Sequence, residues 1–371
     1  MIKDILILGG TGVMGTYLVD LLNKNFDYNI FITTRKSYDN KDNVYYIKGN
    51  AHDLTFITPL VKSKKWYAII DFMNYSTIEF EERNEVYLKN TEQYIFLSSA
   101  RVYSESTNLI TEDSNRLLDT VADVTFLKTD DYSLAKAREE NILQSKSIKN
   151  WTIIRPYMTY WKYKLDMGYF SKELWLYRIL HNRKIWFPKD VASKYTTLTS
   201  GYDVAKSIIS IIGNDNAKGE VFHITENNSY KWQEIIDVYK KVLEDNGYMF
   251  NIVYLEKPMI QSEYIYKYDR VYNRMFDNTK INKFINNSTF VCAIDGIKNA
   301  IEEFLINPKF NAIDWKKHAY WDRITNDKTP IKEITGTKNK IIYVILRYVI
   351  SYKYASNLRK FCKSIHKIIK L

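Results

Sequence analysis

Tyr132 and Lys136 lie four residues apart in the stretch DYSLAK, residues 131–136, and together could perform acid/base chemistry. A phenol ordinarily has a pKa of about 10, and a nearby ammonium group favours the phenolate. On a helix, residues i and i+4 share a face, so Lys136 would lie beside Tyr132. The alternative is two ordinary residues on one helical face, because both residue types are common in this chain.

A glycine-rich segment, GGTGVMG, follows the apolar run DILIL near the N-terminus. Its glycines match both G-x-x-G-x-x-G and G-x-G-x-x-G, and either spacing allows a tight strand-to-helix turn whose backbone N–H groups approach a pyrophosphate. The segment predicts a dinucleotide site, and the alternative is a structural turn. The predicted cofactor contacts are Gly9, Gly10, Thr11, Gly12, Val13, Met14 and Gly15.

The next β-rich run, YNIFITTR, ends in Thr33, Thr34, Arg35 and Lys36. Enzymes that prefer NAD usually place an acidic residue near this point. Arg35 could instead contact a 2′-phosphate, so the sequence favours NADP(H), with NAD(H) as the alternative cofactor. The other interpretation is that Arg35 and Lys36 are solvated surface cations.

Strand-like and helix-like segments alternate through the first 160 residues, which indicates a parallel sheet covered on both faces. We expect an α/β fold of the doubly wound Rossmann type, with a smaller C-terminal substrate-binding domain and a basic helical tail. Residues 1–160 would form the nucleotide-binding domain, with a return segment near 190–212. Residues 161–330 would mainly form the substrate-binding domain, and 331–371 the tail.

The charge is concentrated at the C-terminal end. The 371 residues include 54 Lys and Arg against 43 Asp and Glu, but nine of the basic residues and none of the acidic ones lie from Lys338 onward. The remainder is nearly neutral, which argues against a general polyanion-binding surface. The two cysteines, Cys292 and Cys362, lack metal-ligand spacing and suit a reducing compartment. We therefore expect a cytoplasmic protein without a metal site.

Six segments, in order, resemble the extended short-chain dehydrogenase/reductase family of nucleotide-sugar epimerases, dehydratases and ketoreductases. They are GGTGVMG, GNAHDL, SSARVY, YSLAK, IIRP and YDVAKSI, within residues 3–305. The resemblance implies that Tyr132 is the acid/base, that Lys136 binds the nicotinamide ribose and that Ser99 holds the substrate oxygen. Ser99 is preferred to Ser98 because the family's Ser or Thr lies four residues before a tyrosine, here Tyr103. Further cofactor contacts are implied for Asp53, near the adenine, Leu54 and Pro156.

Ala100 and Arg101 follow Ser99, where the family's 4,6-dehydratases have an Asp-Glu pair. Neither residue can act as a carboxylic acid, which argues against a dehydratase. Ketoreductases and epimerases need only the Ser, Tyr and Lys set. Epimerases of the family usually retain NAD and reductases exchange NADPH, so Arg35 favours a reductase, with an epimerase as the alternative.

The segments IIDFMNYST, QYIFLSSARVYSES and WTIIRPYMTY look like reductases encoded with bacterial surface-polysaccharide genes, such as dTDP-4-dehydro-6-deoxyglucose reductase. The implied substrate is a nucleoside-diphosphate 4-keto-6-deoxy sugar, and the implied assembly is a homodimer. Met158 departs from the Asn of many family members. The expected substrate contacts are Ser99, Tyr103, Lys194, Arg270 and Arg274, although Lys194 and both arginines could be surface charges.

One branch of the family, the chloroplast stem-loop-binding type, shares the look of IIDFMNYS and QYIFLSSARVY and is associated with RNA. A nucleic-acid-binding protein is therefore an alternative from another class. The retained Tyr132 and Lys136 argue against it, as does the lack of a basic-aromatic platform in the body. A protein that binds NADP without turnover is a third interpretation.

In the tail, SNLRKFCKSIHKIIK places apolar residues at spacings of three and four, which is typical of one helical face. We expect a basic amphipathic helix that docks on the inner, anionic membrane surface or on a membrane-bound glycosyltransferase. The alternative is that this face packs on the protein's own body or in a dimer. The apolar residues are Leu358, Phe361, Ile365 and Ile368.

Overall fold

The computed structural model describes residues 2–24, 27–256 and 263–349, which fall into two compact units. Unit 1 holds the described residues of 1–161, 195–230 and 272–297, and unit 2 holds those of 162–194, 231–271 and 298–371. The chain therefore returns to unit 1 twice. The sequence analysis expected one return, near 190–212, and did not separate 272–297 from the second domain.

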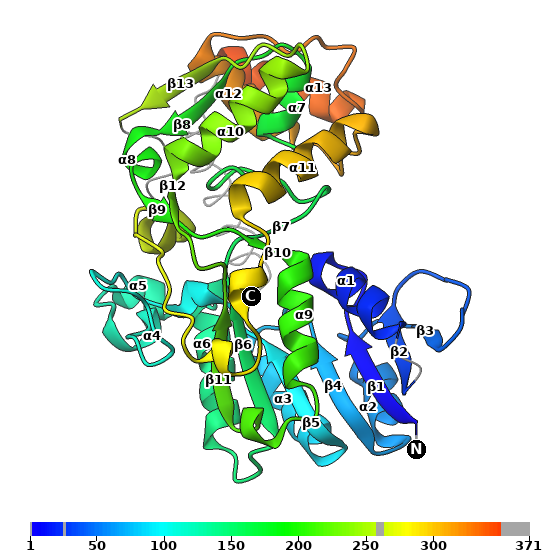
Figure 1. Ribbon diagram of the computed structural model, residues 1–371. Coiled ribbons are helices and arrows are strands. Elements are labelled where there is room, and N and C mark those ends of the chain that lie inside the picture. Colours follow the sequence, from blue (N-terminus) through cyan, green and yellow to red (C-terminus); the bar gives the residue numbers. More distant parts are fainter. Residues whose placement is uncertain (1, 25–26, 257–262, 350–371) are drawn as a thin grey trace, which may run out of the picture. The chain divides into compact units, whose positions relative to one another are not determined.

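Seven strands form one sheet in unit 1, in the order β11-β6-β5-β4-β1-β2-β3 (Figure 1). Every neighbouring pair is parallel. Strands buried on both faces read as nearly continuous apolar runs, which explains segments such as WYAIID. The predicted α/β fold of the Rossmann type is confirmed. The strands are β1 (Lys3–Leu8), β2 (Tyr28–Thr34), β3 (Val44–Lys48), β4 (Trp66–Asp71), β5 (Thr91–Leu97), β6 (Trp151–Pro156) and β11 (Glu220–Ile224).

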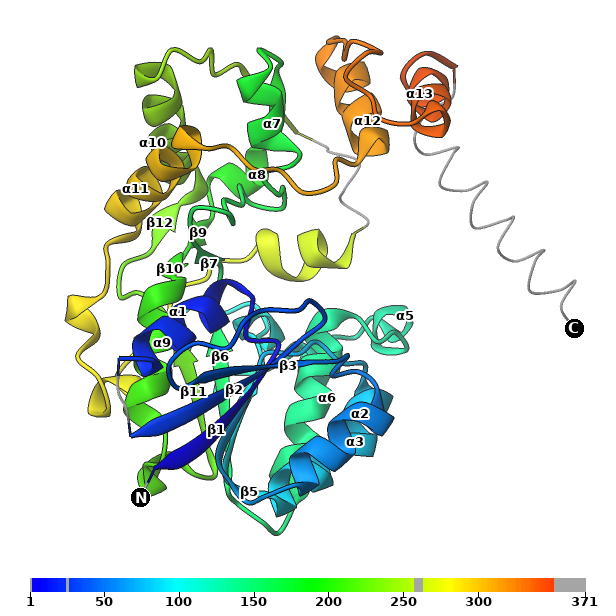
Figure 2. The same cartoon turned by 90° about the vertical axis from the view of Figure 1, so that its right-hand side faces the viewer.

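Helices cover both faces of this sheet (Figure 2). Ile5 and Ile7 of β1 join one hydrophobic core, and Leu6 and Leu8 join the other, because side chains alternate along a strand. Helices α1 (Val13–Leu22) and α9 (Gly201–Ile211) pack on the first core. The second core is covered by α2 (Leu54–Lys62), α3 (Thr77–Lys89) and α6 (Tyr132–Ser145). The carboxyl ends of all seven strands thus meet at one edge.

Unit 2 has a two-stranded parallel sheet of β8 (Ile185–Pro188) and β13 (Ile252–Leu255). Arg178 is fully buried there, and its Nη1 lies 2.6 Å from Oδ1 of Asp322. The helices of this unit are α7 (Trp175–Leu180), α8 (Lys189–Ala192), α10 (Trp232–Asp245), α12 (Trp315–Thr325) and α13 (Thr337–Val344). The other elements of the chain are α4 (Leu117–Thr120), α5 (Val124–Leu127), β7 (Thr159–Tyr160), β9 (Tyr195–Thr196), β10 (Thr199–Ser200), β12 (Tyr230–Lys231) and α11 (Ala293–Ile306).

The first part of the predicted tail packs inside unit 2. Tyr343 is fully buried and donates a hydrogen bond to Oδ2 of Asp322 (2.6 Å), and Leu346 and Ile334 join the same core cluster with Trp315. These residues of the predicted tail therefore belong to a core cluster of unit 2, and the start of a separate tail at residue 331 stays a prediction. The amphipathic face from Leu358 to Ile368 lies outside the described residues. No helix in the described part of the chain has the length and apolar character needed to cross a bilayer.

Candidate functional site

The glycine turn between β1 and α1 requires glycine at Gly9 and Gly15. Gly9 has a φ of +71°, in the left-handed region that favours glycine. A Cβ on Gly15 would lie 2.5 Å from the carbonyl oxygen of Gly10, whereas one on Gly12 would meet nothing closer than 3.9 Å. Within the described part of the chain, no side chain caps the N-terminus of α1. The turn therefore fits a phosphate group placed against backbone N–H donors at the positive end of a helix.

A cavity of about 350 Å³ opens beside this turn, along the carboxyl ends of β1 to β4. Arg35 lies on its wall, directly after β2, as a contact with an adenosine 2′-phosphate would require. The lining residues are Gly9, Thr11, Gly12, Thr33, Thr34, Arg35, Gly49, Asn50, Ala51, His52, Phe72, Met73 and Asn74.

The other predicted cofactor residues are not among those that line this cavity. Asp53 caps helix α2, where its Oδ1 accepts from the backbone N–H (2.9 Å) and the hydroxyl (2.7 Å) of Thr55, and these bonds lower the pKa of the carboxyl. Leu54 begins α2, Val13 begins α1 with Met14 next to it, and Pro156 ends β6. Contact of Asp53 with adenine stays a prediction.

Tyr132 is the first residue of α6, and the preceding Asp131 fixes the start of this helix. Oδ1 of Asp131 accepts from the backbone N–H of Ser133 (3.1 Å), an N-cap that satisfies one of the first helical N–H groups. Tyr132 is half-buried. The positive end of the helix dipole therefore lies beside this residue.

Lys136 is fully buried and connects α6 to the wall of the cavity. Its Nζ donates to the carbonyl oxygen of Met73 (3.3 Å) and to Oε2 of Glu139 (2.9 Å), and lies 4.5 Å from the centre of the Phe96 ring. Met73 lines the cavity. Lys136 therefore contacts a residue of the wall of the glycine cavity.

Arg101 connects Ser99 with Tyr132. Its backbone N–H donates to Oγ of Ser99 (3.2 Å), and its guanidinium carbon lies 5.1 Å from the centre of the Tyr132 ring. Burial lowers the pKa of Arg101, and Asp131, 3.9 Å away, opposes this effect. The sequence analysis considered only that Arg101 cannot be a carboxylic acid. The structure makes it a cation on the face of the candidate acid/base.

The Ser98 hydroxyl forms its hydrogen bond with Glu140, away from the contacts of Ser99. This hydroxyl donates to Oε1 of Glu140 (2.5 Å), which also accepts from Nε of Arg155 (2.8 Å). Oε2 of Glu140 accepts from Arg155 (2.6 Å) and Arg116 (3.2 Å). Burial lowers the pKa of Arg155, but the paired Glu140 carboxylate outweighs burial and raises it. We call Ser98, Tyr103, Arg116, Glu140 and Arg155 the Glu140 network.

Tyr103 belongs to this network. Its hydroxyl accepts from Nη1 of Arg155 (2.9 Å) and lies 3.3 Å from Nδ1 of His223, whose Nε2 donates to the carbonyl of Asp277 (2.6 Å). Burial lowers the pKa of His223 to about 4, so the ring is neutral near pH 7 and Nδ1 accepts from Tyr103. Tyr103 is fully buried. This placement favours a structural role, and a substrate contact from Tyr103 stays a prediction.

The predicted substrate cations have different surroundings. Arg274, in unit 1, is fully buried and donates to the carbonyl oxygens of Tyr103 and Ser104, both at 3.1 Å. Arg270, in unit 2, is buried and donates to the carbonyl of Gly168 (3.0 Å). The interpretation of these two arginines as surface charges is wrong. Lys194, also in unit 2, is half-buried.

Met158 has a φ of +41°, a left-handed conformation that Asn tolerates better than Met does. The sequence analysis identified this residue as a departure from the family's Asn. Its side chain packs against the cluster that contains Tyr103 and Phe276. The backbone thus keeps a shape suited to Asn although the side chain serves packing.

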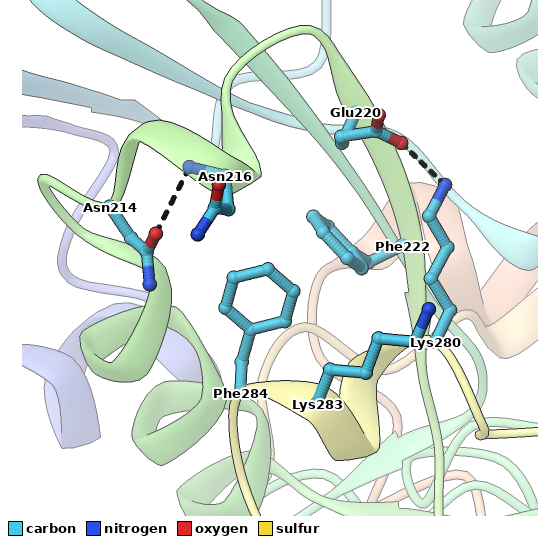
Figure 3. Close-up of a pocket in the computed structure, with 7 residues that line it drawn as sticks. All are labelled: Asn214, Asn216, Glu220, Phe222, Lys280, Lys283 and Phe284. Atoms are coloured by element: carbon cyan, nitrogen blue, oxygen red, sulfur yellow. Dashed lines mark hydrogen bonds and ion pairs between the residues drawn. The ribbon is translucent and has the colours of Figure 1, made fainter.

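A second cavity, of about 440 Å³, lies at the amino end of β11 in unit 1 (Figure 3). Nζ of Lys280 pairs with Oε2 of Glu220 at 2.7 Å. Glu220 begins β11, whereas the glycine turn follows the end of β1, so the two cavities lie at opposite edges of the parallel sheet. The residues that line it are Asn214, Asn216, Glu220, Phe222, Lys280, Lys283 and Phe284. In the described ranges, no cluster of His, Cys, Asp and Glu could hold a metal ion.

No protein-family model matches the chain. A curated relative, the chloroplast stem-loop binding protein of 41 kDa b from Arabidopsis thaliana, is 28% identical over 238 residues. That alignment covers 60% of this chain and spans only 58% of the length of the relative.

Solved structures share the fold. A dTDP-glucose 4,6-dehydratase from Bacillus anthracis, in complex with NAD, has a TM-score of 0.64 at 17% identity, over 82% of this chain and 97% of the other. A UDP-glucuronic acid 4-epimerase from Bacillus cereus, with UDP-glucuronic acid and NAD, has a TM-score of 0.62 at 15% identity, over 81% and 100%. A UDP-N-acetylglucosamine 4-epimerase from Methanobrevibacter ruminantium has a TM-score of 0.64 at 17% identity, over 82% and 99%.

Proposed function

We propose that the protein is an NAD(P)-dependent enzyme that modifies a nucleotide sugar through Ser99, Tyr132 and Lys136. The observation that carries this proposal is the contact at Met73, whose carbonyl accepts from Lys136 while the residue lines the glycine cavity. Fold neighbours solved with NAD and with nucleotide sugars support it.

Each chemical role follows from a contact. The bound nicotinamide would supply the hydride donor or acceptor. Tyr132 would exchange a proton with the substrate oxygen that Ser99 orients. The N-terminus of α6 and the guanidinium of Arg101 place positive charge beside Tyr132, and Lys136 follows one helical turn later. The glycine turn, which side chains would fill, would hold the pyrophosphate.

Within this class we favour reduction of a nucleoside-diphosphate 4-keto-6-deoxy sugar with NADPH. Arg35 on the cavity wall supports NADPH, because a guanidinium pairs well with phosphate. The NAD in neighbouring structures supports the alternative, an epimerase that retains NAD. Ala100 and Arg101, in place of an acidic pair, argue against dehydration.

RNA binding is the second candidate, because the curated relative is named a stem-loop binding protein. Assembly as a homodimer and docking of the tail on a membrane or a glycosyltransferase are further proposals. They rest on the resemblance and on the basic, amphipathic sequence after Lys338.

One set of titrations separates these functions. Nicotinamide fluorescence would measure binding of NADPH and NADH, and each would then be tested with dTDP-4-keto-6-deoxyglucose. A reductase oxidises one NADPH per alcohol formed. An epimerase interconverts UDP-sugars with no net change in cofactor. Absence of binding to either cofactor, together with tight binding of a stem-loop RNA, would reject the enzyme and support the RNA-binding alternative.

A further inference from the structure

Glu139 lies one helical turn after Lys136 on α6, and both side chains are buried. The side chains of Lys136 and Glu139 are 2% and 0% exposed, and Nζ lies 2.9 Å from Oε2. In the part of the chain that the structure describes, Oε1 of Glu139 has no hydrogen-bond partner. The single strong partner of this buried carboxylate is thus the candidate catalytic lysine.

Burial without a counter-ion would make Lys136 a poor cation. Desolvation penalises the charged form of a buried lysine and can shift its pKa by several units. A neutral amine could not favour the phenolate of Tyr132 electrostatically. The carbonyl of Met73, at 3.3 Å, can orient the ammonium but carries no net charge. Glu139 is the carboxylate that pairs directly with Nζ, at 2.9 Å, while the charge of the ammonium also acts on the buried Asp71 and lowers its pKa.

The groups that surround Glu139 oppose its ionisation. Burial raises the pKa of Glu139 to about 7, Lys136 counteracts this, and the acidic residues Asp71 and Asp130 raise it further. Asp71 is itself fully buried at the end of β4, with its pKa raised by burial, and it accepts from the hydroxyl of Tyr94 (2.8 Å). The other titratable groups whose charge acts on Asp71 or on its tyrosine neighbours are Tyr75, Arg83 and Tyr87. Lys136 is therefore the group that favours the carboxylate form of Glu139, and an unpaired buried lysine would lose its proton more readily.

We infer that Glu139 is a positioning residue, whose carboxylate keeps the buried ammonium of Lys136 charged and fixed against the wall of the cofactor cavity. The inference rests on the proposed function, because Lys136 matters only if a cofactor and Tyr132 use its charge. Glu139 does not itself touch the reacting atoms. It acts through the lysine.

The test is the pH dependence of cofactor binding in Glu139→Gln, which keeps the shape of the side chain and removes its charge. Dissociation constants for NADH and NADPH would be measured by fluorescence between about pH 6 and pH 9, a range that spans the lowered pKa expected for an unpaired lysine. The wild type should bind nearly uniformly. In Glu139→Gln, affinity should fall by about tenfold or more as pH rises, the scale of one lost charged hydrogen bond.

Two variants make the test selective. Glu85→Gln removes one carboxylate from an exposed site on α3 and should leave the pH profile unchanged. Glu139→Asp retains a carboxylate one methylene farther from Nζ and should restore most of the wild-type profile. If Glu139→Gln does not fold, Glu139→Asp is measured in its place. A pH profile of cofactor binding in Glu139→Asp that is identical to that of Lys136→Met would then overturn the inference.

The outcomes separate the two proposals. If the wild type, freed of any nucleotide that it retains, binds neither cofactor at any pH, the proposed function fails. If the wild type binds and a folded Glu139→Gln keeps the wild-type profile, the inference alone fails.

Discussion

Glu139 and Glu140 are adjacent residues on helix α6, and both are fully buried. Their carboxylates differ in the number of hydrogen bonds that they accept. Glu140 receives hydrogen bonds from Ser98, Arg116 and Arg155, which occupy both of its oxygens. Glu139 has Lys136 on one oxygen and no hydrogen-bond partner on the other within the described residues. Both oxygens of the Glu140 carboxylate therefore accept hydrogen bonds, whereas within the described residues one oxygen of the Glu139 carboxylate accepts none.

The difference indicates two uses of a buried charge. A carboxylate whose oxygens are all engaged by arginines and a hydroxyl is fixed, and the network ties β5, α6 and β6 together. A carboxylate with one cationic partner can change its charge at moderate cost. Perturbed groups of this second kind concentrate at functional sites. The comparison therefore predicts that variants in the Glu140 network lose stability, whereas variants around Glu139 and Tyr132 lose function.

The largest effect should come from Glu140→Gln. The amide would turn an N–H group toward Arg155 and leave its buried guanidinium without a counter-charge, so the free energy of unfolding should fall by about 3–5 kcal/mol. Urea unfolding followed by circular dichroism would measure it, beside Glu139→Gln. If Glu139→Gln destabilises the protein as much, Glu139 is structural and the contrast between the neighbours is wrong.

Tyr132→Phe should have the next largest effect, on turnover alone. Loss of the proton donor should reduce turnover by about 10²-fold or more, while cofactor binding and the unfolding midpoint stay close to wild type. Steady-state kinetics with the best sugar nucleotide would measure it. Tyr202→Phe, at an exposed tyrosine, is the matched control. Turnover near that of the wild type would remove Tyr132 from the mechanism.

Some features of the fold and of the candidate site could be predicted from the sequence, and others could not. The glycine turn and the parallel sheet follow from local patterns: glycines after an apolar run, and alternation of strand and helix. The choice between Ser98 and Ser99 depends on which hydroxyl meets α6, and that is set by packing of β5 against β6 and the helix.

Glu139 and Arg101 were missed for related reasons. The i, i+3 spacing of Lys136 and Glu139 was visible in the sequence, but the same spacing on an exposed face is an ordinary surface pair worth little. The Lys136–Glu139 pair differs from such a surface pair because both of its side chains are buried. Arg101 depends on a turn that brings residues 99–101 beside the start of α6, a contact between distant segments. The burial of Arg270 and Arg274 was equally hidden, because both donate to backbone carbonyls far away in sequence, although Arg270 also pairs with the adjacent Asp269.

Arg35→Ala should have an intermediate effect, limited to one cofactor. Loss of a charged contact with the 2′-phosphate should weaken NADPH binding by about 1.5–3 kcal/mol and change NADH binding little. Fluorescence titration would measure both affinities. Lys36→Ala is the matched control, because Lys36 follows in the chain but does not line the cavity. Equal losses for the two cofactors would make Arg35 structural, and a wild type that prefers NADH would refute the choice of NADP.

The smallest effects, from Ser98→Ala and Ser99→Ala, test the comparison at its finest scale. Ser98 is 1% exposed and donates to a charged carboxylate, so its loss should cost about 1–2 kcal/mol of stability and leave turnover nearly unchanged. Among the residues that the structure describes, the bond of Ser99 is the 3.2 Å one that it accepts from the backbone of Arg101, so its loss should cost little stability. Turnover in Ser99→Ala should nevertheless fall by about tenfold or more, because the substrate oxygen loses its orienting hydroxyl. Thermal unfolding and kinetics would give a stability and a turnover for each variant. We expect Ser98→Ala to lose mainly stability and Ser99→Ala to lose mainly turnover. A reversed pattern would move the catalytic role to Ser98 and would require the Glu140 network to open during turnover.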